Sequence, residues 1–155
     1  MYVFSSFKHS YDREMEDIMS VVKELIRTEE NGKLSFGDYT LSEKTKKEDF
    51  QYEGDLMKVK TYKDITRLEK NGLVLYESVP GTSVNEFKET EDGVDFAVEG
   101  PGDAQITLGL AEDTSYNVFV AGKEIGMMKT NLGGKLAISV ELAGMGETEV
   151  KVVKA

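Results

Sequence analysis

Apolar and polar residues alternate along most of the chain from residue 33 to the C-terminus. The clearest case is the segment 136–142, LAISVEL, which has an aliphatic residue at every second position. Because successive side chains of a β-strand point to opposite faces, this pattern predicts a strand with one buried face. Similar alternation predicts strands at 57–61, 94–98 and 105–110. The segment 116–120, YNVFV, is apolar on both faces, which favours a strand in the interior of a sheet.

Short turn sequences separate these segments. Asn-Gly and Asp-Gly pairs readily adopt the positive φ that tight hairpin turns require. Such pairs occur at Asn71-Gly72 and Asp92-Gly93. Hairpin turns are also expected at Glu53-Gly54, Ala121-Gly122 and Asn131-Leu-Gly-Gly134. The sequence therefore predicts an all-β fold, either an antiparallel β-sandwich or a rolled sheet, of about nine or ten short strands.

The N-terminal part has a different pattern. Apolar residues of the segment 11–26 recur at helical spacing, which predicts a short amphipathic helix there. A hairpin should follow, pairing residues 25–28 with 34–36 across the turn at Asn31-Gly32. A second interpretation is that residues 1–18 are a non-native or peripheral extension, because back-translation of the residues before Met19 allows GGAGG, a ribosome-binding sequence, ahead of its codon. Residues 19–155 are expected to form a single β-sandwich-like domain.

Composition excludes several classes of site. The 155 residues carry a formal net charge of -10, which disfavours nucleic-acid partners because an anionic surface repels phosphate. There is no cysteine and a single histidine, His9, which excludes a thiol nucleophile, a two-histidine metal site and any disulfide. No apolar run of 18 residues predicts a membrane span, and residues 1–8 lack the pattern of a secretory signal. We expect a cytoplasmic protein with no cofactor.

Four segments carry a resemblance to a known family: ELIR at 24–27, KLSFGDY at 33–39, VLYESVPGT at 74–82 and KTNLGGKL at 129–136. Over residues 19–155 the chain resembles short uncharacterised proteins from Gram-positive anaerobes that are often labelled endosialidase. That label implies cleavage of sialosides, which uses a cluster of arginines around the substrate carboxylate within a large propeller. The chain has only Arg13, Arg27 and Arg67 and is too short for such a propeller, so we predict no sialoside hydrolysis and assign no catalytic residue.

A weaker resemblance covers residues 114–152. Their order of strands and glycine turns is similar to the terminal β-sandwich module of polysaccharide-processing enzymes, which implies contact with carbohydrate. The residues that suit this role are tyrosines, whose rings stack on sugar faces, and arginines, which bind carboxylates. The candidate ligand-binding residues are Tyr39, Tyr52, Tyr62, Tyr76, Arg27 and Arg67. The alternative is that the tyrosines are half-buried packing residues of strands.

The acidic residues around the turn at 91–93 raise a calcium hypothesis. Asp92 and Asp95 are the candidate ligands, although calcium sites use six or more oxygens from a denser acidic loop. The alternative is that both are turn and solvent-face acids.

Two functions follow from these observations. The first is a non-enzymatic interaction or accessory module, which binds a protein partner or a second copy through a surface that includes Phe119 and one side chain of Met127-Met128. The second is a carbohydrate-binding or carbohydrate-processing accessory protein. Tyrosine rings and an acid on one concave surface would favour the second function. A flat polar face with an apolar edge would favour the first.

Overall fold

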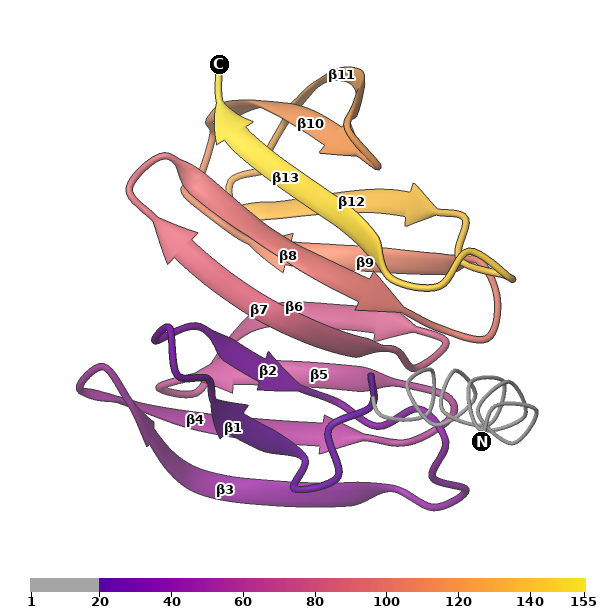
Figure 1. Ribbon diagram of the computed structural model, residues 1–155. Coiled ribbons are helices and arrows are strands. Elements are labelled where there is room, and N and C mark those ends of the chain that lie inside the picture. Colours follow the sequence, from indigo (N-terminus) through magenta and orange to yellow (C-terminus); the bar gives the residue numbers. More distant parts are fainter. Residues whose placement is uncertain (1–19) are drawn as a thin grey trace.

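The computed structural model describes residues 20–155, which form two antiparallel β-sheets packed face to face (Figure 1). In spatial order, sheet A contains β1 (Ile26–Thr28), β2 (Leu34–Phe36), β7 (Ser83–Thr90), β8 (Gly93–Glu99), β13 (Thr148–Lys154), β10 (Ser115–Val120) and β11 (Lys123–Lys129). Sheet B contains β12 (Lys135–Val140), β9 (Ala104–Gly109), β6 (Leu73–Val79), β5 (Thr66–Lys70), β4 (Asp55–Thr61) and β3 (Thr45–Tyr52). The all-β sandwich predicted from the alternation is confirmed.

The core lies between the two sheets and includes a cluster of aromatic rings. Phe36, Phe87 and Phe96 come from sheet A, and Tyr76 comes from β6 of sheet B. The ring of Tyr76 meets those of Phe36 and Phe96 edge to face, with centroids 5.3 and 5.5 Å apart. Edge-to-face pairs of this kind stabilise a core beyond the area they bury, so these rings join the two sheets.

The turns predicted from glycine pairs are confirmed at four hairpins: β3–β4, β5–β6, β7–β8 and β10–β11. At the β5–β6 turn, Asn71 and Gly72 have φ values of 50° and 84°, and at the β10–β11 turn Ala121 and Gly122 have values of 53° and 81°. Two successive positive φ angles give a turn whose twist matches that of the strands it joins. The hairpin of β1 and β2 is also confirmed, with Ile26 opposite Phe36.

Residues 20–155 contain thirteen strands, more than the nine or ten expected. Some strands are very short, such as β1 and β2, and half of the residues of β3 are charged. The turn at Glu53-Gly54 predicts that a strand ends there, but four charged residues at 46–49 conceal where β3 begins. The strand forms nevertheless, because β4 supplies its backbone hydrogen bonds whatever side chains β3 carries.

The predicted helix over 11–26 is wrong for the part that the structure describes. Residues 20–25 form turns and bends. The Val22 amide donates to the Gly37 carbonyl (2.9 Å), and the Gly37 amide donates to the Leu25 carbonyl (2.9 Å). Val22 and Ile26, which lie four residues apart, are both buried, so the helical spacing of these apolar residues arises from tertiary packing of a turn and a strand. The rest of this helix, and the proposed extension over 1–18, lie outside the described residues.

The segment Asn131–Gly134 is a turn, but it does not form the expected hairpin. It connects β11 of sheet A to β12 of sheet B, and the Gly134 amide donates to the Asn131 carbonyl (3.0 Å). The Asn131 side-chain oxygen also accepts the amides of Gly133 and Lys135, each at 2.9 Å. The Asn131 side chain thus closes the turn locally. The strand that follows, β12, pairs with β9 and so joins sheet B.

The strand predicted at 136–142 is present as β12, and Ile138 is only 3% exposed. Its side chains reach the core, although the strand itself is an edge of sheet B and pairs only with β9. Strand β10, in contrast, lies inside sheet A between β13 and β11, as its apolar sequence predicted. Within residues 20–155 there is no helix long and apolar enough to span a membrane.

Candidate functional site

A group of cations lies on the outer face of sheet B. In the β3–β4–β5 register, Lys46 is opposite Lys60, and Lys60 is opposite Arg67. The alternate residues of β4 and β5, such as Val59 and Leu68, are buried in the core, so this row points to solvent. We call Lys44, Lys46, Lys58, Lys60 and Arg67 the basic face.

Charge is only partly balanced on the basic face. The Arg67 guanidinium binds Glu77 through Nη2 (2.9 Å) and Nε (3.2 Å). Lys58 lies 3.7 Å from Glu48 and opposite Glu69 of β5. Among the described residues, no carboxylate lies within ion-pair distance of Lys44, Lys46 or Lys60. Partial burial lowers the pKa of Lys60, and the nearby charges of Arg67 and three lysines lower it further. Cations are therefore concentrated here in a chain whose net charge is -10.

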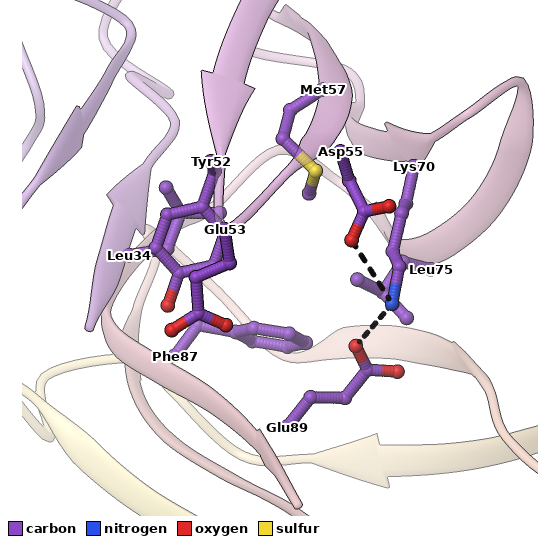
Figure 2. A pocket seen from close by; sticks show the side chains of 9 residues that line it. All are labelled: Leu34, Tyr52, Glu53, Asp55, Met57, Lys70, Leu75, Phe87 and Glu89. Carbon is purple, nitrogen blue, oxygen red and sulfur yellow. Dashed lines mark hydrogen bonds and ion pairs between the residues drawn. The ribbon is translucent and has the colours of Figure 1, made fainter. Parts of the chain in front are cut away.

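A second feature is a small pocket at one end of the sandwich, between the sheets. Figure 2 shows its lining, in which Lys70 lies between Asp55 and Glu89 and apolar side chains form the interior. Lys70 Nζ is 2.9 Å from Glu89 Oε1 and 3.8 Å from Asp55 Oδ2. Its hydrogen bond to Glu89 raises the pKa of Lys70, so the lysine stays protonated at neutral pH. Because Lys70 belongs to sheet B and Glu89 to sheet A, the pair joins the two layers.

The pocket is too small for an organic ligand. Its volume is about 20 Å³, which corresponds to a single water molecule. At its rim the Tyr52 hydroxyl donates to the Gly32 carbonyl (2.7 Å), and Lys88 binds Glu53 across the two sheets (3.1 Å). These contacts close the end of the core, and we interpret the pocket as a structural feature.

The four candidate tyrosines do not form one platform. Tyr76 lies on β6 with its side chain directed into the core, and it is fully buried, so it is unavailable to any ligand. Tyr52 ends β3 beside the pocket, whereas Tyr62 follows the opposite end of β4. Six residue steps along β4 separate those two ends by about 20 Å. Tyr39 is half-buried in the loop between β2 and β3.

The two candidate arginines lie on different sheets. Arg27 is on β1 and binds Glu24 (3.1 Å) and Glu29 (3.0 Å), whereas Arg67 belongs to the basic face. The structure therefore does not bring them together to bind one carboxylate.

The two candidate calcium ligands are also separated. Asp92 is exposed in the β7–β8 turn, and Asp95 lies on β8 opposite Lys88 and Lys151 of the neighbouring strands. In residues 20–155, no group of three or more His, Cys, Asp or Glu side chains is placed to hold a metal ion.

Strand alternation orients the methionine pair as expected. Met127 is 66% exposed, and Met128 packs partly against the core. Sequence reasoning missed the lysines of the basic face, although the spacing of Lys44 with Lys46 and of Lys58 with Lys60 was a usable signal. Comparison of the chain with protein-family models, curated proteins and solved structures gave no match.

Proposed function

We propose that this protein is a non-catalytic interaction module that binds an acidic segment of a protein partner through the basic face. The observation that supports this function is the concentration of cations on the outer face of sheet B in an otherwise acidic protein. Folding places Lys44, Lys46 and Lys60 near one another without neutralising them, although carboxylates outnumber cations in the chain. Like charges held together in this way bind anions favourably.

The spacing of the cations suits an extended peptide. Lys58 and Lys60 are two residues apart on β4, which corresponds to about 6.6 Å along the strand. Carboxylates at alternate positions of an extended peptide have the same spacing, so a peptide that runs along β4 meets successive ammonium groups. The only guanidinium of the face, that of Arg67, is already engaged by Glu77. The remaining contacts are lysine point charges, which suit flexible acidic chains better than one rigid group.

The alternative function, binding or processing of carbohydrate, receives less support. It depended on several tyrosine rings on one surface, and Tyr52, Tyr62 and Tyr76 lie in three different places. An acidic polysaccharide is the form of carbohydrate that the basic face would fit, and the experiment below includes one. A cytoplasmic location is part of the proposal, and fractionation of the host cell tests it.

The experiment measures binding of a fluorescent peptide of alternating glutamate and serine by fluorescence anisotropy at low salt. We expect saturable binding that weakens as salt rises, because exposed ion pairs are screened. The Lys46→Gln/Lys60→Gln variant should bind roughly two- to thirtyfold more weakly, from about 0.2–1 kcal/mol for each lost pair. Both residues are surface lysines, so the melting temperature should not change.

The matched control is Lys151→Gln/Lys154→Gln, which removes the same charge from β13 of sheet A. It should leave the affinity close to that of the unaltered protein. Equal weakening in the control, or no binding at low salt, would refute the proposed function. Polygalacturonate that competes far better than the peptide would favour the carbohydrate function, and an oligonucleotide that does so would refute both.

A further inference from the structure

Strand β11 is an edge strand with exposed apolar side chains. It ends sheet A, pairs only with β10, and lies at the end of that sheet in Figure 1. Ile125 is 51% exposed and Met127 is 66% exposed. An edge strand offers unpaired backbone amides and carbonyls to another strand, and proteins usually protect such edges.

The other edges of the sandwich are protected or carry no large apolar groups. Strand β3 has four consecutive charged residues at 46–49, and β1 is only three residues long. Strand β12 exposes the small residues Ala137 and Ser139. Apolar exposure on β11 therefore distinguishes it from the three remaining edges of the described chain.

A β-bulge decides which β11 side chains share a face. The register places Lys129 opposite Ser115, Met127 opposite Asn117 and, after the irregularity, Glu124 opposite Phe119. Ser115, Asn117 and Phe119 are alternate residues of β10, so their three partners also lie on one face. The outer face of β11 therefore reads acid, apolar, base: Glu124, Met127, Lys129.

That order is self-complementary. We propose that a second copy of this chain pairs its β11 antiparallel to β11, about a two-fold axis that passes at Met127. The axis brings the two Met127 side chains together and places Glu124 of each copy beside Lys129 of the other. Opposite charges that face each other across strands stabilise a pair, so both ends of the contact are favourable.

Other features of β11 agree with this register. An axis at Gly126, counted in the same register, would instead place Met127 of each copy beside Glu124 of the other and leave Lys129 without an acidic neighbour. Within its own chain Lys129 is 3.1 Å from Asp113, but both side chains are more than 60% exposed, so this ion pair is weak and leaves Lys129 able to bind Glu124 of the second copy. The fit of charge therefore selects the axis at Met127.

The symmetry has a consequence for binding. A two-fold axis perpendicular to sheet A preserves the direction in which each sheet faces, so both copies present sheet B on the same side of the dimer. Two basic faces on one side bind a partner with two acidic segments more tightly than one face does. This consequence rests on the proposed function, whereas the dimer itself does not.

The experiment measures the mass of the full chain by light scattering over a hundredfold range of concentration, without any ligand. We expect a monomer–dimer equilibrium. Glu124→Lys and Lys129→Glu should each weaken association at least about tenfold, because each places like charges together twice per dimer. The double variant Glu124→Lys/Lys129→Glu should restore it.

Two further variants act as controls. Met127→Glu should abolish association, whereas Leu73→Glu, at a leucine 75% exposed on β6, should leave it unchanged. The Lys46→Gln/Lys60→Gln variant should dimerise normally, which separates failure of the dimer from failure of the proposed function. A chain that stays monomeric throughout, or single variants that weaken association without rescue in the double, would overturn the proposal.

Discussion

The buried hydroxyls of Tyr76, Thr82 and Ser78 form a chain of hydrogen bonds. We predict that the loss of stability on removing a hydroxyl depends on its position in this chain. The Tyr76 hydroxyl lies 2.8 Å from Thr82 Oγ1, which lies 2.8 Å from Ser78 Oγ, and all three residues are fully buried. Burial raises the pKa of Tyr76, so its hydroxyl stays neutral and can donate or accept. Thr82 is the central member and Tyr76 a terminal one.

Removal of the terminal hydroxyl should cost little. In Tyr76→Phe one hydrogen bond is lost, but Thr82 keeps Ser78 as a partner, so no buried group loses its only hydrogen bond. We expect a loss of about 1 kcal/mol. Thr82→Val removes the central hydroxyl and conserves shape, so Tyr76 and Ser78 both lose this partner. Because Ser78 also lies close enough to the Tyr76 hydroxyl to lower its pKa, the two can partly compensate, and we expect the loss that corresponds to one unpaired group, about 1–3 kcal/mol.

Urea denaturation, followed by tyrosine fluorescence and circular dichroism, measures both free energies of unfolding. The double variant should lose less stability than the sum of the single variants, because Tyr76 no longer has a hydroxyl to leave unpaired. A Thr82→Val loss no larger than that of Tyr76→Phe would refute the reasoning and show that the outer hydroxyls bond directly to each other.

Four further predictions concern other parts of the molecule. Ile138→Ala should cost about 2–5 kcal/mol in urea denaturation, because it empties a core position, whereas Ser139→Ala on the solvent side should cost less than about 0.5 kcal/mol. Ser83→Ala should raise stability by up to about 1 kcal/mol, since among the described residues only the Ser83 hydroxyl is buried without a partner; a clear loss would contradict this. A chain that begins at Met19 should melt within a few degrees of the full chain, and a drop of more than about ten degrees would refute the peripheral role of residues 1–18. No free sialic acid should be released from sialosides, and release that disappears in Arg67→Ala would overturn that expectation.

Local signals predicted much of the fold. Alternation revealed β12, and a run that is apolar on both faces revealed β10. Glycine pairs such as Asn71-Gly72 located the hairpins, because a positive φ at a turn is a property of the residues themselves. The turn at Glu53-Gly54 predicted the end of β3, but its start was not detected because the charged residues 46–49 carry no apolar alternation. The residues near Val22 were misread as helix because Val22, Leu25 and Ile26 have the i, i+3, i+4 spacing of a helix, although a turn and the start of β1 bring them to the core.

The candidate site was less predictable, because it depends on which strands become neighbours. Tyr76 was a candidate for ligand stacking, and only the packing of the two sheets shows that its ring belongs to the core. Lys46 and Arg67 are far apart in sequence, and they share the basic face because both β3 and β5 pair with β4.

The sequence alone determined that the chain folds as antiparallel strands, because side-chain alternation and turn geometry act over a few residues. Tertiary structure decided the order of the strands within each sheet, and with it the neighbours of every exposed side chain. The segment Asn131–Gly134 illustrates the difference. The Asn131 side chain specifies the turn, but the free edge of β9 determines that the next strand, β12, joins sheet B. Pairing between distant segments is a long-range contact, and no local pattern encodes it.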